Sequence, residues 1–492
     1  MSAQLPALQV VLPLLAALLA ALVRHGGTAW LIALAASLAM PVIAFTMLMQ
    51  VLDGGSISYA LGGWPPPFGI EYRVDVLSAF VLLLVSIAGA VMLPYARLSV
   101  AAEIASSRRA WFYAMYLLCL SGLLGIVITG DAFNAFVFLE ISSLAAYAMI
   151  AMGRDRRALF AAYQYLIMGT IGATFYVIAV GLLYTITGTL NLVDMANRFA
   201  DITTMRPLFA ALAFLTVGVS LKFALFPLHV WLPNAYAYAP SFTTAFLAAT
   251  ATKAAVYLLL RYFYSVYGIG VVFGAQPVSE ILLLLSVAAM FIASLVAVFQ
   301  QNIKRMLAYS SVAQIGYITL GISLANQTGL TGGIVHLFNH AMIKGALFLA
   351  VGGVVYRLGF ARIGQFDGLG RRMPLTMAAL VLAGLALIGT PGTAGFISKW
   401  YLALGALEKG WWWLVALIVA SSLISVLYIG RVVEHAYFRE PTEETRKARE
   451  LPASMLIPIW VLTAATVYFG IETSLTVGVA RRAAEMLLAG LR

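Results

Sequence analysis

The sequence predicts an all-α polytopic membrane protein with about fourteen transmembrane helices. Hydrophobic residues make up 63% of the 492-residue chain and charged residues 10%, so the apolar surface is too large for one water-soluble core. Runs of roughly 17 to 25 apolar residues, each long enough to cross a bilayer, follow one another along almost the whole chain. Both observations indicate the same class.

Polar or Pro/Gly-containing breaks between the apolar runs give the bounds of the expected helices. In chain order they are 5–23, 28–52, 74–96, 110–130, 132–152, 160–187, 207–228, 241–264, 278–300, 305–324, 329–357, 374–404, 411–436 and 453–470. The first run has no basic residue before it and no small-residue cleavage site, so we expect a retained span. The tail 472–492 has an apolar stripe opposite Arg481, Arg482 and Glu485, which predicts an interfacial amphipathic helix.

The loops predict the orientation of the chain in the cell membrane. Seventeen basic residues, Lys304 among them, fall on one side of the expected spans, and seven fall on the other. Because cytoplasmic loops carry the excess of Lys and Arg, both termini should face away from the cytoplasm. The net charge of +11 therefore reflects topology and not nucleic-acid binding. The single cysteine, Cys119, excludes an internal disulfide and a Cys-ligated cluster built by this chain alone.

Four lysines fall well inside expected spans: Lys222, Lys253, Lys344 and Lys399. A charge at bilayer depth costs roughly 2.5 to 3.5 kcal/mol even on a lenient insertion scale, so four of them need a reason. Any one of these lysines can instead extend its side chain to the nearer interface. That alternative fits Lys222 and Lys399 poorly, because each lies beside a helix interruption, where the unwound backbone needs polar groups as hydrogen-bond partners.

Glu140 is the one carboxylate expected near the middle of a span, in "FVFLEISSLAAYAMIA". An isolated ionised carboxylate is costly there, so Glu140 is either protonated or paired with a lysine of another helix. Lys222 is the natural partner. A protonated Glu140 that only makes a hydrogen bond between helices is the alternative.

The stretch "GIVHLFNHAMIKGALFLAVGG" places His336, His340 and Lys344 four residues apart, on one helix face. Two histidines at this spacing can bind zinc, but the sequence contains no HExxH motif and identifies no third ligand. With Lys344 on the same stripe, a proton relay is the preferred hypothesis, because histidine and a buried lysine can both exchange protons near neutral pH. Hydrogen bonds between helices, without proton traffic, remain the alternative.

Prolines interrupt the seventh expected helix after Lys222 and the twelfth just before Lys399. The freed carbonyls are tolerated in a membrane only beside protein or a water-filled cavity. Two such breaks, five helices apart, predict two inverted five-helix repeats, helices 4–8 and 9–13. The expected organisation is therefore 1–109, N-terminal helices; 110–264, first repeat; 278–436, second repeat; and 453–492, last span and tail.

Several stretches together resemble one family, the antiporter-like proteins shared by Mrp-type sodium/proton antiporters, respiratory complex I and membrane-bound hydrogenases. The similarity covers about residues 70 to 440 and rests on "FLEISSLAAYAMIA", "LPNAYAYAPSFTTAFLAATATKAAVYLLLR", "NIKRMLAYSSVAQIGYI", "HLFNHAMIKGALFL" and "TPGTAGFISKW". Within the family, "GGWPPPFGIEYRVDVLSAFVLL" and "TGDAFNAFVFLEISSLAAYAMIA" look most like the D-type component of the Mrp complex.

This resemblance implies a role for each candidate residue. Glu140 and Lys222 match the family's glutamate–lysine pair, Lys253 its central relay lysine, and Lys399 its terminal exchange site, where some members have glutamate. His336, His340 and Lys344 match the polar stripe of the second half.

The family further implies a subunit that moves protons along these groups, in a complex with other membrane subunits. The sequence itself has no cluster ligands and no nucleotide motif, so we expect no cofactor or metal held by this chain. A cation/proton antiporter is the first hypothesis. A proton-pumping subunit of complex I or a membrane-bound hydrogenase is the alternative.

Overall fold

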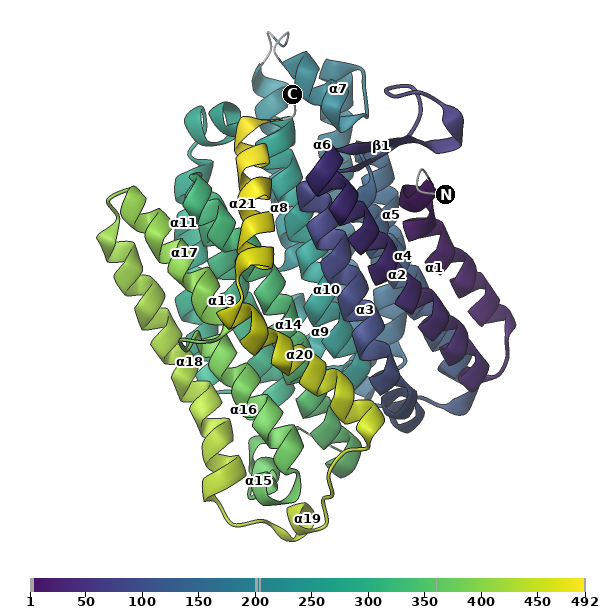
Figure 1. Cartoon of the computed structure of the whole chain (residues 1–492), viewed down its shortest axis with the longest axis vertical. Helices are drawn as coiled ribbons and strands as arrows, with labels where there is room; N and C mark the ends of the chain where they lie inside the picture. Colours follow the sequence, from purple (N-terminus) through teal and green to yellow (C-terminus); the bar gives the residue numbers. More distant parts are fainter. Residues whose placement is uncertain (1–3, 200–201, 203–204, 360, 491–492) are drawn as a thin grey trace.

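The computed structural model describes residues 4–199, 202, 205–359 and 361–490. These residues form one bundle of helices that run close to a common axis (Figure 1). The start of α1, the end of α21 and the hairpin of β1 and β2 lie toward the same end of the bundle (Figure 1). Which side of the membrane this end faces stays a prediction.

The N-terminal part precedes two sets of helices that we call the first half (α4 to α10) and the second half (α11 to α18). The N-terminal part comprises α1 (Leu5–Leu22), α2 (Gly26–Gly54), β1 (Ile57–Ala60), β2 (Glu71–Val74) and α3 (Val76–Glu103). The first half comprises α4 (Arg109–Ile128), α5 (Ala132–Ala151), α6 (Arg156–Thr187), α7 (Leu192–Arg198), α8 (Met205–Phe223), α9 (Trp231–Tyr238) and α10 (Ser241–Leu260), which continues as a π-helical turn, η5 (Arg261–Val266).

The second half begins with a span that contains another π-helical turn. It comprises α11 (Val278–Ala288), η7 (Ala289–Ala293), α12 (Ser294–Val298), α13 (Ile303–Ser323), α14 (Gln327–Leu358), α15 (Leu369–Arg372), α16 (Pro374–Ile388), α17 (Ala394–Glu408) and α18 (Trp412–Phe438). The chain ends with α19 (Glu443–Arg446), α20 (Ala453–Ile471) and α21 (Ser474–Ala489).

Twelve of the described helices are long and apolar enough to cross a membrane. The number is up to thirteen if the segment Ile363–Arg372 and α16, which are sharply bent against each other, count as one span. The chain is therefore a polytopic integral membrane protein. The two expected spans that are not among the twelve, 305–324 and 374–404, are formed as α13 and as the α16/α17 pair. The expected number of fourteen spans stays a prediction.

Helices of the two halves start at matching positions. Gln327 and Leu358, the ends of α14, each follow the ends of α6 by 171 residues (327 − 156 and 358 − 187). The same offset separates α13 from α5 (303 − 132) and α18 from α10 (412 − 241). Two isolated β-bridges repeat it as well, Asp131 with Asn191 and Asn302 with Arg362.

Polar side chains cap the matching helices at their N-termini. Asp131 and Asp155 accept backbone N–H groups at the starts of α5 and α6, and Asn302 and Asn326 do so for α13 and α14. A capping side chain satisfies one of the backbone donors that a helix start leaves free. Local sequence thus sets where these long helices begin.

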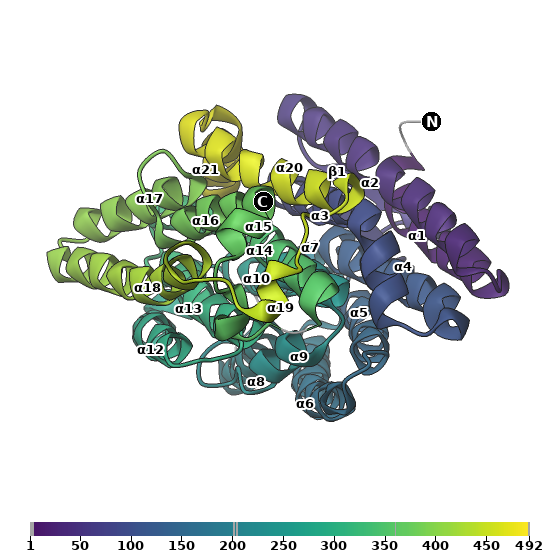
Figure 2. The ribbon, with the colours of Figure 1, turned by 90° about the horizontal axis from the view of Figure 1, so that it is seen from below.

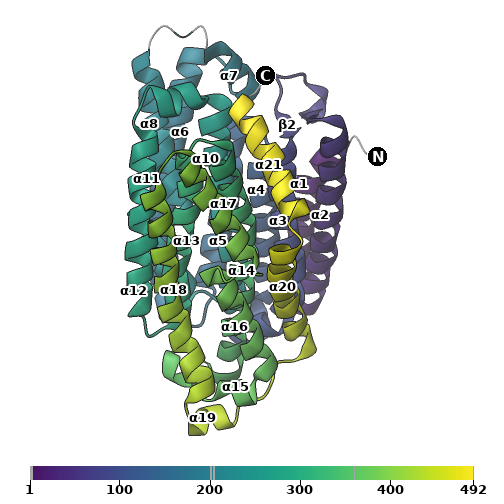
Figure 3. The same ribbon diagram turned by 60° about the vertical axis from the view of Figure 1, so that its left-hand side comes forward.

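Two spans are broken, as the prolines predict. In the first half α8 ends at Phe223, Ala224 has a positive φ of 61°, and α9 begins at Trp231. In the second half α16 ends at Ile388, the following Gly389 has a φ of 91° that suits a residue without a Cβ atom, and α17 begins at Ala394. Figure 3 shows α16 and α17 stacked end to end beside α14.

Helices α3, α10 and α14 form the centre of the bundle, and α1, α2, α6 and α18 lie at its edge (Figure 2). The membrane-spanning window of α10 is 94% buried, whereas that of α18 is 33% buried. Polar groups on α10 and α14 are therefore shielded from lipid by the protein itself.

Two features differ from the sequence prediction. An antiparallel hairpin, in which Ile57 pairs with Val74 and Ala60 with Glu71, interrupts the otherwise helical chain. The tail does form a helix, α21, but it stands along the bundle beside α14 and does not lie flat in an interface (Figure 1). The reason is that its small-residue face, which includes Ala480 and Ala483, is buried against α14 and α3.

Candidate functional site

Glu140 of α5 and Lys222 of α8 form an ion pair at the first helix break. Lys222 Nζ lies 3.2 Å from Glu140 Oε1 and donates a hydrogen bond to Ser143 Oγ at 3.0 Å, one turn further along α5. The Trp231 indole N–H donates to the Leu221 carbonyl at 2.9 Å, which satisfies a backbone acceptor that the break leaves free. The Lys222 side chain is 4% exposed and that of Glu140 is 26% exposed.

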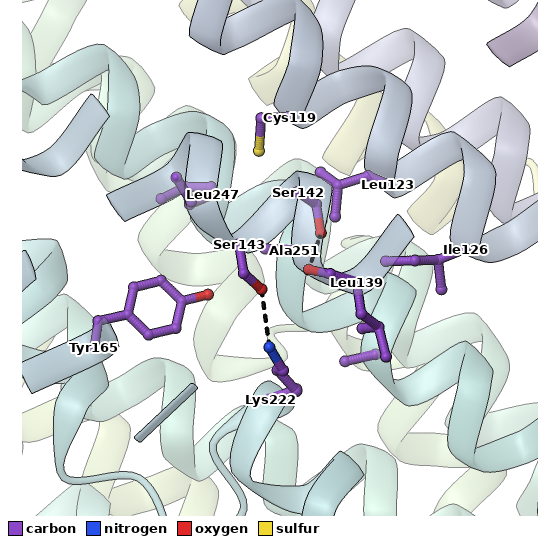
Figure 4. A pocket seen from close by; sticks show the side chains of 12 residues that line it. Cys119, Leu123, Ile126, Leu139, Ser142, Ser143, Tyr165, Lys222, Leu247 and Ala251 are labelled. Atoms are coloured by element: carbon purple, nitrogen blue, oxygen red, sulfur yellow. Dashed lines mark hydrogen bonds between the residues drawn. The ribbon is translucent and has the colours of Figure 1, made fainter. Parts of the chain in front are cut away.

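A small cavity of about 20 Å³ adjoins Lys222. Ser143 and Lys222 contribute its polar atoms, together with Ser142 and the Tyr165 hydroxyl, and Cys119 lines it as well (Figure 4). A cavity of this size has room for about one water molecule. Such a water can carry a proton between the Lys222 ammonium and a neighbouring hydroxyl.

Lys253 lies near the middle of α10, which packs along α14. Its Nζ donates to the Ala248 carbonyl of its own helix and to Thr252 Oγ1 at 3.3 Å. The residue is 1% exposed. No carboxylate of the described chain lies within ion-pair distance of it.

The histidine stripe of α14 contains one fixed ring and one ring without protein partners. His336 Nδ1 lies 2.8 Å from Ser398 Oγ of α17, and its Nε2 lies 3.0 Å from Gln314 Oε1 of α13. The parallel His340 ring lies 6.1 Å from that of His336 and makes no hydrogen bond with the described residues. Both rings are buried, so each nitrogen of His340 is a place where an internal water can bind.

Lys344 continues this stripe one turn beyond His340. Its Nζ donates to the Leu307 carbonyl at 2.9 Å and also to Ser310 Oγ, both on α13. The residue is fully buried. Its partners are thus neutral oxygens.

Lys399 of α17 lies just beyond the second helix break. Its Nζ donates to the carbonyls of Leu387 and Ile388 at 3.2 and 2.8 Å, and to Ser422 Oγ of α18 at 2.9 Å. The same atom lies 4.6 Å from the centre of the Tyr317 ring, which favours a positive charge. The break therefore exposes two carbonyls that hold the ammonium.

The structure brings together only some of the predicted residues. Glu140 contacts Lys222 directly, and His336 stacks near His340. Lys253, Lys344 and Lys399 each bond to hydroxyls and carbonyls, and within the described residues none bonds to another predicted site residue. Buried polar atoms without a described protein partner, such as Ser220 Oγ and Asn339 Oδ1, lie among these helices and can bind bridging waters.

Sequence reasoning missed a second polar stripe, on α13. Ser310, Gln314 and Tyr317 are spaced four and three residues apart and face Lys344, His336 and Lys399 respectively. This spacing is that of one helix face, so the signal was present in the sequence.

Two further buried groups also differ from expectation. Lys304, which we counted as a loop residue, is 5% exposed and donates to the Ala239 carbonyl at 2.6 Å, because it lies in the first turn of α13 beneath α9. Arg261, which was not among the candidate residues, lies in the π-helical turn and pairs with Asp75 at 2.6 Å. The Asp75–Arg261 pair joins α3 to the end of α10.

The described residues contain no group of three or more His, Cys, Asp or Glu side chains placed to hold a metal ion. His336 and His340 thus lack the further ligands that a zinc site needs. What the arrangement can do is hold and release protons: an acid paired with a lysine at one break, and lysines and histidines with neutral partners elsewhere.

Comparison with known proteins identifies the family of this chain. A family described as "NADH:quinone oxidoreductase/Mrp antiporter, TM" matches residues 129–425. The chain is 43% identical over 489 residues to the N subunit of NADH-quinone oxidoreductase from Desulforudis audaxviator, with 96% of each chain covered. It is 28% identical to the D subunit of the Na(+)/H(+) antiporter from Alkalihalophilus pseudofirmus, over 88% of this chain and 86% of that protein.

Two solved structures have the same fold. A chain of the membrane-bound sulfane sulfur reductase, an archaeal respiratory membrane complex, superposes with a TM-score of 0.92 at 31% identity, covering 99% and 98% of the two chains. A chain of the Mrp complex from Dietzia sp. superposes with a TM-score of 0.90 at 26% identity, covering 99% and 97%. The D-type component of Mrp is thus not singled out. The chain belongs to the antiporter-like family of membrane subunits shared by NADH:quinone oxidoreductases and Mrp antiporters.

Proposed function

We propose that this chain is a proton-translocating subunit of a multi-subunit membrane complex. It moves protons along a file made of Glu140, Lys222, Lys253, the stripe of His336, His340 and Lys344, and Lys399. The observation that carries the proposal is the Glu140–Lys222 ion pair beside a helix break and a water-sized cavity.

The pair works as a switch because its two charges stabilise each other. While Glu140 stays 3.2 Å from Lys222, the ammonium keeps its proton. When the carboxylate is protonated or moves away, the buried lysine loses its counter-ion, and its proton passes through water toward Lys253 and α14. Each transfer changes the charge next to the following group, so the groups titrate as a coupled set. Lys399, beside the second break, hands the proton to one aqueous side.

We further propose that partner subunits cover the outer face of α5. The Glu140 side chain is 26% exposed on that face, next to the exposed Leu144. An ionised carboxylate facing lipid at this depth is costly, and a partner subunit or a hydrated crevice removes the cost. The chain by itself should not support full transport.

For the driving energy, we place a redox-driven complex ahead of an independent cation/proton antiporter. The support is the 43% identity to a protein named for NADH-quinone oxidoreductase, against 28% for the antiporter protein, and the 31% identity to a respiratory complex. The antiporter assignment, which sequence analysis preferred, is the second hypothesis and is supported by the TM-score of 0.90 with the Mrp complex.

The two halves are proposed to be inverted repeats. Their common offset of 171 residues (327 − 156) supports one ancestral unit. The two units run through the bundle in opposite directions. Helix α5 starts beside the hairpin, where the Gly130 N–H donates to the Glu71 carbonyl, whereas α13 starts at the opposite end, where Lys304 donates to the Ala239 carbonyl. An inverted pair of broken helices is typical of transporters.

Proton flux in vesicles that contain the whole assembly tests the function. Lys253→Met should abolish flux, and Lys253→Arg should fail nearly as badly, because arginine keeps its charge and does not deprotonate. Thr250→Val, one turn away on α10, removes a buried hydroxyl that bonds only to its own helix and should leave flux near normal. Normal flux in Lys253→Met at equal assembled amounts would refute a file through α10.

Purifying the native assembly separates the two driving forces. A redox complex should co-purify with flavin or iron and should form a pH gradient only with an electron donor. An antiporter should contain neither and should exchange protons against an imposed sodium or potassium gradient.

A further inference from the structure

An apolar slot opens on the outer surface between α2, α3, α14, α20 and the start of α21. Its volume is about 90 Å³, and every side chain that lines it is apolar. Leu48, Phe80 and Phe338 form the buried inner wall, and Val461 and Leu475, which are 46% and 42% exposed, form the rim. A slot with no polar lining does not hold ordered water, and its size suits about three methylene-sized groups.

The slot lies at the depth of the hydrocarbon core. Gln327, the first residue of α14, donates to Glu485 Oε1 at 2.6 Å and thereby sets the level of α21. Leu475 is ten residues before Glu485, so the rim of the slot lies about 15 Å deeper along the helix. A helix of 32 residues such as α14, centred in the bilayer, extends beyond a hydrocarbon core of about 30 Å by roughly 9 Å at each end. Glu485, which is level with the start of α14, therefore lies outside the hydrocarbon core, and the rim of the slot, about 15 Å deeper, lies inside it.

Arg482 lies above the slot, at the boundary of the hydrocarbon core. It follows Leu475 by two helical turns on the same face of α21, and its Nη1 donates to the Leu52 carbonyl of α2 at 3.4 Å. Leu52 in turn is one turn above Leu48 of the slot wall. In the described part of the chain Arg482 has no ion pair, whereas its neighbour Arg481 pairs with Glu485.

We propose that this slot binds an acyl chain of an anionic phospholipid whose phosphate is held by Arg482. The geometry matches such a lipid, with a dry apolar cleft at acyl depth and an unpaired guanidinium about 10 Å nearer the surface. Phe338 and Met342 of the slot belong to α14, on the side opposite the histidine stripe. The lipid therefore packs against the helix that carries His336 and His340, and it completes the support of that helix.

Counting the phospholipids retained by the purified assembly tests this site. Ala465→Phe fills the slot and should remove one tightly held phospholipid from native mass spectra. Ala464→Phe, the neighbouring exposed position outside the slot, should keep it. Equal retention in these two variants would overturn the proposal, as would a partner side chain found in the slot in a structure of the complex.

The two adjacent arginines provide a second test that does not alter the packed core. Arg482→Gln should weaken retention of phosphatidylglycerol by about fivefold, the effect of one arginine near a membrane surface, and should weaken retention of phosphatidylcholine less, because its choline cation offsets the charge of the phosphate. Arg481→Gln, which loses only its bond to Glu485, should behave like the unmodified protein. The same loss in both arginine variants, or in neither, would show that no headgroup is held at Arg482.

Discussion

The two halves of the molecule share a framework but differ in how they hold their charges. In the first half Lys222 has a carboxylate 3.2 Å away. In the second half Lys344 and Lys399 are held by hydroxyls and carbonyls, and the position that matches Glu140, 171 residues later, is Ser311. In the first half the lysine is thus held by an opposite charge that a partner can disturb, and in the second half the lysines are held by neutral oxygens.

The largest expected effect comes from removing the compensation in the first half. Glu140→Ala leaves Lys222 buried without its anion, and breaking a buried pair in this way costs about 3 to 5 kcal/mol, so flux should fall by roughly 100-fold or more. Ser311→Ala is the matched control, because Ser311 bonds only to the Leu307 carbonyl of its own helix. Proton flux in vesicles at equal assembled amounts is the measurement.

Retained flux in Glu140→Ala would show that the pair is structural. A Ser311→Ala variant that fails equally would show that the two halves do not differ as we describe.

A somewhat smaller effect is expected at Lys399. If this residue passes protons to one aqueous side, Lys399→Arg should lose at least about tenfold in flux, nearly as much as Lys399→Ala, because arginine does not deprotonate. Lys399→Glu should keep part of the activity, since a carboxyl group can also exchange a proton.

Near-normal flux in Lys399→Arg would show that Lys399 acts as a fixed positive charge above the Tyr317 ring and does not exchange protons. The proton exit would then have to be sought at His336 or His340.

A moderate effect is expected at two positions that match each other, Ser143 and Gln314 (314 − 143 = 171), because each holds a titratable group. Ser143 accepts from Lys222 at 3.0 Å, and Gln314 bonds to His336 at 3.0 Å. Losing one such hydrogen bond costs about 1 kcal/mol, so Ser143→Ala and Gln314→Leu should each reduce flux by about fivefold. Unequal losses would show which half limits the rate of transfer.

The halves were also unequally predictable from sequence. Glu140 and Lys222 were paired because an acid and a base at bilayer depth each need an opposite charge, and the sequence offers few candidates. The partners of Lys399, among them Ser422 and Tyr317, are hydroxyls and aromatic rings, which abound in such a chain, so they become visible only when α13, α17 and α18 are packed together.

The fold shows the same limit. Apolar runs and prolines predicted the helices and both breaks, because these depend on local chemistry. The upright position of α21 depends on tertiary contacts, because the face that includes Ala480 and Ala483 is buried against α14 and α3. The hairpin did have a local signal, alternating Ile and Tyr around a Pro/Gly-rich turn, which the strong helical pattern obscured.

The smallest expected effect distinguishes two equivalent helix caps. Asp155 Oδ1 accepts the backbone N–H of Arg157 at the start of α6, and Asn326 Oδ1 accepts that of Gly329 at the start of α14, each at 2.9 Å. Replacing either cap by alanine should destabilise the first turn by about 1 kcal/mol. Hydrogen exchange of the first-turn amides, measured by mass spectrometry, reports this locally.

Only the first-half cap should respond to pH. A hydrogen bond from the Arg157 side chain lowers the pKa of Asp155 below 3.8, so its contribution is present above that value and is lost as pH falls through the lowered pKa. Acidification should therefore increase exchange at the start of α6 by a small amount, because solvent screens the partly exposed carboxylate, and should leave α14 unchanged. Asp155→Asn should keep the cap and remove the pH response. If α14 opened equally on acidification, the cause would lie in the bundle as a whole and not in the difference between these two caps.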